Sequence, residues 1–227
     1  MKKRIGLAIH GGAGTIRKQD IAEAKQEEIE SALRLSMEAG VKCLNEGGAS
    51  LDATEAAVKV MENSPLFNAG RGCVFTATET IEMDASIMCG KSLEAGAVTC
   101  VRNIKNPISL AIKILAESPH VLLSGAGAED FARKQELVFE SDDYFQTPHR
   151  LKQLKDAQSE STVQLDHSLS KDGKFGTVGA VALDVHGNLA AATSTGGMTN
   201  QAEGRVGDTP IIGAGTYANN QTCAVSC

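Results

Sequence analysis

The apolar residues of this chain change their spacing from segment to segment, and each spacing predicts a different element. Residues 5–9 form a short apolar run ended by glycines, which predicts a buried strand. Between Asp20 and Glu46 apolar residues recur at spacings of four among Glu, Lys and Ala, which predicts an amphipathic helix. Ser50 is a suitable capping residue for a second helix.

The middle of the chain predicts further strands with helices between them. Pro107 opens one predicted helix, and a charged helix is expected from Ala126 onward. Glycine-containing turns separate the strand candidates. These candidates are residues 73–76, 82–88, 95–101 and 121–123.

The stretch from about residue 151 to residue 175 is rich in Lys, Gln, Ser and Asp and shows little apolar periodicity, so it predicts a mobile linker. After it, residues 177–184 and 189–195 predict two strands around a four-residue turn with glycine, which together form a hairpin. Strands, then helices between strands, then strands again favour a single α+β layered domain.

Composition narrows the class of protein. Of the 227 residues, 42% are hydrophobic and 22% charged, as in ordinary globular proteins, and the net charge of −6 argues against nucleic acid or an anionic membrane as partner. The N-terminal apolar run is too short for a signal peptide or a membrane span, so we expect a cytoplasmic protein. Six cysteines without a CxxC pair argue for reduced thiols and against a zinc site.

The glycine-rich segment His10-Gly-Gly-Ala-Gly14 follows the first predicted strand. It is similar to an esterase oxyanion loop, but the chain has no Gly-x-Ser-x-Gly nucleophile elbow. It also lacks the Gly-x-Gly-x-x-Gly spacing of a dinucleotide fold. A structural turn and a substrate-facing loop both remain open for this segment.

Composition changes abruptly at Gly176–Thr177, from polar linker to apolar strand. This junction can simply be a loop that meets a strand. Alternatively, the Thr177 hydroxyl can attack the preceding carbonyl, which glycine leaves uncrowded. The α-amine released by such a cleavage has a pKa near ~7.7–8.0 and would serve as a base beside the hydroxyl.

Two charged residues, Arg205 and Asp208, stand in the glycine-rich loops that follow. They can be an ordinary solvated ion pair. Arginine can also hold a carboxylate through two parallel hydrogen bonds, and aspartate can hold an ammonium group. Together the two side chains would suit the zwitterionic end of an amino acid.

Several motifs together resemble those of the plant-type asparaginases, also called isoaspartyl aminopeptidases or β-aspartyl-peptidases, which are N-terminal-nucleophile hydrolases. The resemblance covers the whole chain, and GTVGAVALD and TSTGGM are its most specific parts. The motifs are HGGAGT (10–15), PLFNAGRGCVFT (65–76), EMDAS (82–86), GTVGAVALD (176–184), ATSTGGMTN (192–200), GRVGD (204–208) and GAGTYANN (213–220).

The resemblance implies a nucleophile at Thr177 that acts after the chain cuts itself between Gly176 and Thr177. The products would be an α chain of residues 1–176 and a β chain from residue 177 onward. Thr195 matches the threonine that lies beside the nucleophile and helps to set its protonation. The implied reaction is hydrolysis of L-asparagine and β-aspartyl dipeptides.

The resemblance also implies the substrate contacts. Arg205 and Asp208 match the residues that bind the α-carboxylate and the α-amine, and Asn68 matches an asparagine near the active site. No cofactor is required. A structural sodium ion would be held by the backbone carbonyls of Met61, Glu62, Ser64, Phe67, Ala69 and Arg71.

The resembling family has a four-layer αββα sandwich and pairs its αβ units into an (αβ)₂ assembly, so we expect both here. In the family a Thr-Gly-x-Gly-Glu segment, which supplies oxyanion contacts, follows the position of Cys227. We therefore expect a C-terminally incomplete domain. The alternatives are an inactive scaffold or truncated relative, and an enzyme with another substrate, such as a threonine aspartase or a glycosylasparaginase.

Overall fold

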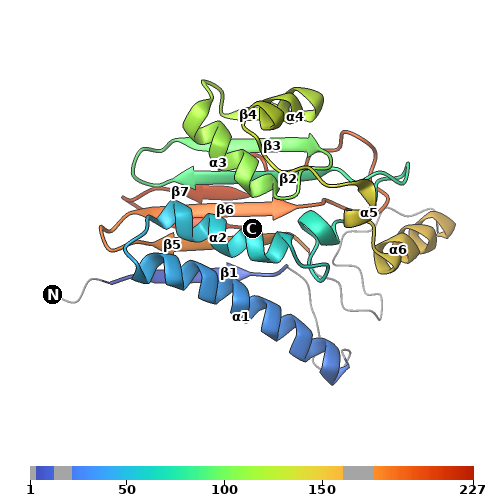
Figure 1. Cartoon of the computed structure of the whole chain (residues 1–227), viewed down its shortest axis with the longest axis horizontal. Coiled ribbons are helices and arrows are strands. Elements are labelled where there is room, and N and C mark those ends of the chain that lie inside the picture. The colour runs from blue at the N-terminus through green and yellow to red at the C-terminus, as the bar shows by residue number, and fades with distance from the viewer. Residues whose placement is uncertain (1–3, 13–21, 161–175) are drawn as a thin grey trace.

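The computed structural model describes residues 4–12, 22–160 and 176–227. A six-stranded sheet with the order β1-β5-β6-β2-β3-β4 lies at its centre (Figure 1). Neighbouring strands are antiparallel, except for the parallel pair β3 and β4. The strands of this sheet are β1 (Gly6–His10), β2 (Met83–Cys89), β3 (Ala95–Val101), β4 (Leu122–Ser124), β5 (Val178–Leu183) and β6 (Leu189–Thr195).

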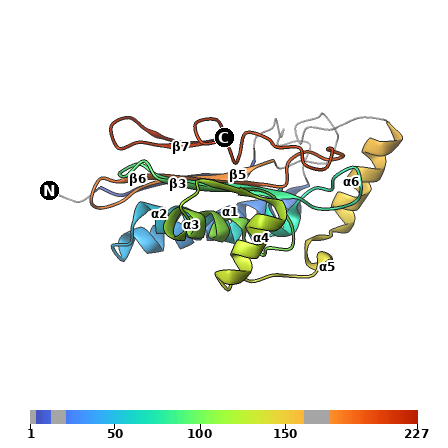
Figure 2. The same cartoon turned by 90° about the horizontal axis from the view of Figure 1, so that it is seen from above.

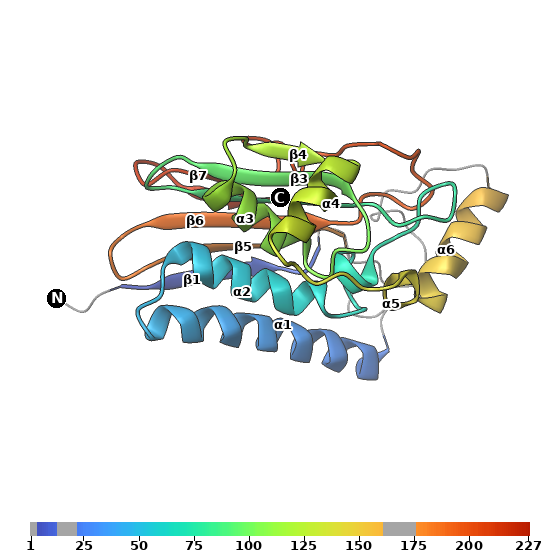
Figure 3. The same ribbon diagram turned by 45° about the horizontal axis from the view of Figure 1, so that its top comes forward.

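Different layers cover the two faces of this sheet. Helices α1 to α4 lie along one face, and a two-stranded sheet of β7 and β8 lies over the other (Figures 2 and 3). The bounds are α1 (Glu23–Asn45), α2 (Ser50–Glu62), η2 (Gly70–Gly72), α3 (Pro107–Glu117), α4 (Gly125–Lys134), α5 (Asp142–Phe145), α6 (Pro148–Ser159), β7 (Thr216–Ala218) and β8 (Ala224–Ser226). The described residues thus form a mixed α/β fold.

The main hydrophobic core fills the space between the helices and the sheet. Small residues let the layers approach closely. A Cβ atom on Gly96 in β3 would overlap the backbone carbonyl of Ala111 in α3, so this strand position admits only glycine. A smaller cluster around Met88 and Ala191 fills the space under β7.

The predicted hairpin is confirmed. Strands β5 and β6 pair from Val178 opposite Ser194 to the closing end of the hairpin. The Asp184 carboxylate closes the turn by accepting hydrogen bonds from the His186 and Asn188 N–H groups, at 2.9 and 3.0 Å. The same carboxylate accepts from the N–H of Ser50, so it also caps the first turn of α2, where Ala49 rather than Ser50 is the N-cap residue.

The expected strand at residues 73–76 is wrong. The chain there follows the short helix η2 and makes only an isolated bridge from Thr76 to Gln201. The reason is that the Val74 N–H donates to the Asn68 side chain, at 3.1 Å, instead of to a neighbouring strand. Side-chain contacts of this kind compete with regular pairing and leave no periodic signal.

The first part of the predicted linker is also wrong, since α6 extends to Ser159. Its buried positions are Arg150, Gln153, Leu154 and Ala157, and polar residues at two of these positions hide the helical period. The rest of the predicted linker, residues 161–175, lies outside the described residues, as do residues 13–15 of the HGGAGT motif.

No helix in the described part of the chain is long and apolar enough to cross a bilayer.

Candidate active site

Thr177 and Thr195 lie opposite each other where the hairpin opens. Val178 pairs with Ser194, so the antiparallel register places Thr177 across from Thr195. The Thr177 Oγ1 donates a hydrogen bond to the Thr195 Oγ1 at 3.1 Å. Because side chains alternate along a strand, both hydroxyls face the side of the sheet that carries β7 and β8.

The Thr195 hydroxyl accepts a second hydrogen bond, from the N–H of Gly197 at 3.0 Å. This contact fixes the oxygen toward which the Thr177 proton is directed. Gly176 is buried and Thr177 is partly exposed, so the predicted cleavage bond lies at the edge of the folded core. The pair can orient a threonine hydroxyl as a nucleophile and receive its proton.

Asn68 holds the turn that follows Thr195. Its side-chain Nδ2 donates to the Gly197 carbonyl at 2.8 Å, and its backbone carbonyl accepts from the Gly196 N–H at 3.1 Å. The side chain is fully buried. The described contacts thus make Asn68 a support for the Thr195 turn, and its predicted contact with substrate stays a prediction.

Arg205 and Asp208 lie on the loop between β6 and β7. The Arg205 Nη1 donates to Gln201 Oε1 at 3.4 Å, and the same oxygen accepts from the Met198 N–H at 2.8 Å. The loop backbone is closed where the Asp208 carbonyl accepts from the N–H of Gly215 at 3.1 Å. The Asp208 side chain itself is exposed, so the loop presents it to solvent.

His10 is a site residue whose role the sequence left open. Its Nε2 lies 3.0 Å from the Ser226 Oγ. Burial lowers the pKa of His10, and a hydrogen bond with the Thr177 backbone opposes this shift. A Cβ atom on Gly179 would overlap both His10 and Ser226, so the missing side chain makes room for their contact. His10 therefore connects β1 and β8 to the start of β5, beside the nucleophile candidate.

Glu82 and Asp84 belong to the EMDAS motif, but no role was predicted for them from the sequence. Both are buried, and Glu82 Oε2 accepts from the N–H of Gly204 at 2.8 Å. Asp84 pairs in register with Thr195. Two acidic residues at alternate positions in a mostly apolar segment were the available signal, because a buried carboxylate must have specific partners.

Glu62 lies on the helix side of β6. Its Oε1 accepts from the Ser194 hydroxyl at 2.7 Å and from the Ile108 N–H at 3.0 Å. Burial raises the pKa of Glu62 to about 7, although these hydrogen bonds oppose the shift. A carboxyl group that is easily protonated therefore lies directly behind the strand that carries Thr195.

The loop predicted to hold a sodium ion brings backbone carbonyl groups close together, and the ion itself stays a prediction. A Cβ atom on Gly72 would overlap the Phe67 carbonyl oxygen, so glycine lets backbone oxygens crowd together there. The Arg71 guanidinium lies over the Tyr144 ring, 5.3 Å from its centroid. The side chain is therefore occupied by this contact, and only the Arg71 carbonyl is a candidate ligand for the ion. Uncharged carbonyl oxygens are suitable ligands for a hard cation. The described residues hold no cluster of three or more His, Cys, Asp or Glu side chains arranged for a metal ion.

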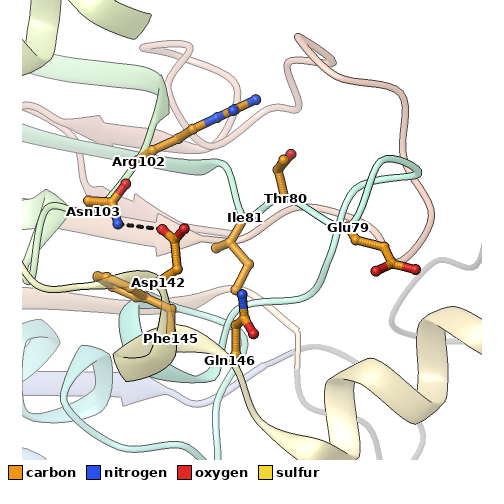
Figure 4. A pocket seen from close by; sticks show the side chains of 8 residues that line it. All are labelled: Glu79, Thr80, Ile81, Arg102, Asn103, Asp142, Phe145 and Gln146. Atoms are coloured by element: carbon orange, nitrogen blue, oxygen red, sulfur yellow. Dashed lines mark hydrogen bonds between the residues drawn. The ribbon is translucent and has the colours of Figure 1, made fainter.

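A surface pocket lies beside α5, and its lining contains none of the predicted site residues (Figure 4). Several of its polar groups already have partners, either within the lining or, for Arg102, in Glu82 outside it. Asn103 Nδ2 donates to Asp142 Oδ1 at 2.6 Å, and the Arg102 Nη2 contacts Glu82 Oε1 at 2.9 Å. The lining residues are Glu79, Thr80, Ile81, Arg102, Asn103, Asp142, Phe145 and Gln146.

Comparison with known proteins shows which family the sequence resembles. The family model Asparaginase_2, described as asparaginase, matches residues 3–227. The isoaspartyl peptidase of Escherichia coli (strain K12) is 49% identical over 224 residues, which are 97% of this chain and 70% of that protein. The putative isoaspartyl peptidase/L-asparaginase of Dictyostelium discoideum is 44% identical, and the aligned region spans 100% of this chain and 74% of that protein.

A mammalian relative is similar at the same level. The isoaspartyl peptidase/L-asparaginase of Mus musculus is 44% identical over 220 residues, which are 97% of this chain and 65% of that protein. These matches run along nearly all of the chain at 44% to 49% identity, and they define its family. The chain belongs to the asparaginase family that the Asparaginase_2 model describes.

Proposed function

We propose that this protein is an amidohydrolase that cuts itself before Thr177 and then hydrolyses L-asparagine and β-aspartyl dipeptides. The observation that carries the proposal is the hydrogen bond from the Thr177 hydroxyl to the Thr195 hydroxyl. The relatives named as isoaspartyl peptidases and L-asparaginases support this substrate class.

The first step is cleavage of the Gly176–Thr177 bond. The Thr177 Oγ1 attacks the Gly176 carbonyl, and its proton passes toward Thr195, which already accepts it. The peptide bond becomes an ester as the Thr177 nitrogen leaves and takes up that proton, which Thr195 passes on, so the Thr195 hydroxyl is unchanged at the end of the step. Water then hydrolyses the ester, which releases the Gly176 carboxylate and restores the Thr177 hydroxyl, so the nucleophile and the free amine that acts as base come to lie in one residue.

In the second step the Thr177 hydroxyl attacks the side-chain amide carbonyl of the substrate, and the new amine accepts the proton. Ammonia or an amino acid leaves, and water hydrolyses the aspartyl ester on Thr177. Arg205 binds the α-carboxylate through its two-pronged guanidinium, and Asp208 binds the α-ammonium group. Asn68 supports the turn behind Thr195 and faces the substrate during the reaction.

The complete architecture belongs to the same proposal. The layers described here, one of helices and two of strands, form part of a four-layer αββα sandwich. Residues 1–176 and 177–227 lie in the α and β chains of one domain, and two αβ units pair as (αβ)₂ in the cytoplasm. A sodium ion binds the backbone carbonyls between Met61 and Arg71, at the end of α2 and in the loop after it. Catalysis needs no further cofactor.

Mass spectrometry of the purified chain tests the cleavage. Two fragments that meet between Gly176 and Thr177 are expected, and Thr177→Val should abolish both cleavage and hydrolysis. Thr177→Ser should cut and hydrolyse, because serine supplies the same hydroxyl and amine. Thr54→Val, which changes a buried threonine in α2, is the matched control and should cut normally. An uncut chain that hydrolyses β-aspartyl dipeptides would overturn the mechanism, and a folded chain that does neither would be a non-catalytic scaffold.

A further inference from the structure

Two buried acidic residues, Glu82 just before β2 and Asp84 within it, face the loop that carries Arg205. Glu82 and Asp84 are 7% and 5% exposed. Two residues apart in an extended segment, they share one face. Neither is exposed enough to be an ordinary solvated charge, and burial of a carboxylate is costly unless fixed partners compensate for it.

Glu82 binds the backbone at the beginning of this loop. Its Oε2 accepts from the Gly204 N–H at 2.8 Å. Its Oε1 accepts from the Arg102 Nη2 at 2.9 Å, and the same nitrogen donates to Glu203 Oε1, also at 2.9 Å. Residues 203 and 204 are therefore attached to the sheet through two carboxylates and one guanidinium.

Asp84 accepts hydrogen bonds from a distorted part of β3. Its Oδ1 accepts from the Thr99 Oγ1 at 2.7 Å and from the Cys100 N–H at 2.9 Å. The pairing of β2 with β3 shifts register at this point, and Cys100 has a φ of 54°. A left-handed conformation is energetically costly for a residue with a side chain. Here it accompanies the irregular pairing that directs two hydrogen-bond donors, the Thr99 hydroxyl and the Cys100 N–H, to Asp84.

Asp84 also interacts with the middle of the loop that carries Arg205. Burial raises the pKa of Asp84, and besides Thr99 and Cys100 two groups of the loop oppose this shift: the Arg205 charge and a hydrogen bond with the Gly207 backbone. The Asp84 carboxylate thus interacts electrostatically with the guanidinium that is proposed to bind substrate.

The position of Asp84 in the sheet relates it to the nucleophile. Asp84 pairs with Thr195 across β2 and β6, and Thr195 lies opposite Thr177 across the hairpin. The three side chains form one row on one face of the sheet. A row of this kind fixes the distance between the group that attacks the substrate and the group that supports Arg205, because the hydrogen bonds of the sheet set the strand spacing.

We infer that Glu82 and Asp84 are positioning residues that set the place and direction of Arg205, and thereby select substrates with an α-carboxylate. Glu82 fixes the backbone from which Arg205 extends, and Asp84 directs the guanidinium. Neither residue contacts the reacting atoms. The inference rests on the proposed function, since it assigns to Arg205 the carboxylate of an aspartyl substrate.

Calorimetry on the self-cleaved protein, with three ligands, tests the inference. L-aspartate carries the α-carboxylate and the α-ammonium group, succinate lacks the ammonium group, and β-alanine lacks the α-carboxylate. Asp84→Asn should weaken binding of L-aspartate and succinate about tenfold and leave β-alanine unchanged, because hydrogen bonds to charged groups contribute on this scale. For β-aspartyl dipeptides, KM should rise about tenfold while kcat changes less than about threefold.

The controls separate positioning from general damage. Asp184→Asn alters another buried, hydrogen-bonded aspartate, in the β5–β6 turn, and should leave all three affinities unchanged. Glu82→Gln should weaken the same two ligands as Asp84→Asn. Equal weakening of all three ligands, no weakening of any, or weakening only of the two amines would overturn the inference. If the wild-type protein binds no L-aspartate and hydrolyses no dipeptide, the proposed function fails and the inference fails with it.

Discussion

The Thr177 hydroxyl donates a hydrogen bond to the Thr195 hydroxyl across the open end of the β5–β6 hairpin, over 3.1 Å. The acceptor is itself fixed by the N–H of Gly197 at 3.0 Å. A proton that leaves Thr177 therefore has a defined first acceptor, and the chemistry proposed for Thr177 depends on Thr195 keeping an oxygen at that place.

Replacement of Thr195 tests this dependence. Thr195→Val keeps the shape of the side chain but removes the acceptor, so self-cleavage and turnover should both fall about 100-fold or more, within the usual range for loss of a proton-transfer partner. Thr195→Ser should stay within a few-fold of the wild type. The cleavage rate from timed mass spectrometry measures the first effect. Normal cleavage in Thr195→Val would show that the proton goes elsewhere.

Gly179 should be intolerant of any side chain. A Cβ atom there would overlap Ser226 and His10, which lie 3.0 Å apart from Oγ to Nε2, so Gly179→Ala should lower the free energy of unfolding by about 2 kcal/mol or more. Gly127→Ala is the control, since a Cβ atom on Gly127 in α4 has nothing within 4 Å. It should be neutral or stabilise the helix by about 0.5–1 kcal/mol. Urea unfolding of both variants measures the difference, and equal stabilities would show that β8 does not pack on β5 as described.

The two buried aspartates should affect stability with opposite dependence on pH. Burial raises the pKa of Asp84. The native state therefore binds this proton more tightly than the unfolded chain does, so the contribution of Asp84 to stability is full below about pH 3.9 and decreases as pH rises through the raised pKa. Burial also acts on Asp184, but hydrogen bonds from Asn188, Ser50 and His186 outweigh it and lower the pKa. The contribution of Asp184 is therefore full above about pH 3.9 and is lost as pH falls through the lowered pKa.

Urea unfolding between pH 3 and pH 7 measures these contributions as differences between wild type and variant. The difference for Asp84→Asn should shrink as pH rises, and the difference for Asp184→Asn should grow. The same sign of slope for both variants would contradict the assignment of their environments.

Sodium should stabilise the loop after α2 if its carbonyl groups bind the ion. Replacing NaCl with tetramethylammonium chloride at equal ionic strength should lower Tm, since an ion that binds only the native state stabilises it by mass action. Gly72→Ala, whose new Cβ would overlap the Phe67 carbonyl, should remove this dependence on sodium. Arg71→Ala should keep it, because only the backbone of Arg71 is proposed to bind. Identical Tm values in both salts for the wild type would argue against the ion.

The sequence by itself determined the elements whose signal is local. Three kinds of signal each lie in residues close together in the sequence: the spacing of four in α1, the apolar runs of β1 and β5, and the glycine-containing turn of the hairpin. The structure has these elements at the predicted places. The motif around Gly176–Thr177 and the threonine at 195 also singled out two side chains that turned out to be neighbours. Antiparallel register alone brings them together once the hairpin forms.

Only the tertiary structure decided what depends on contacts between distant segments. Helix α6 was not predicted because Arg150 and Gln153 are buried against other parts of the chain, where Arg150 Nε donates to the Gly72 carbonyl at 2.8 Å. The role of Asp84 needed strands β2, β3 and β6 and the Arg205 loop together. The partners of a buried polar group are chosen by the whole fold and not by its neighbours in sequence, so no local pattern can name them.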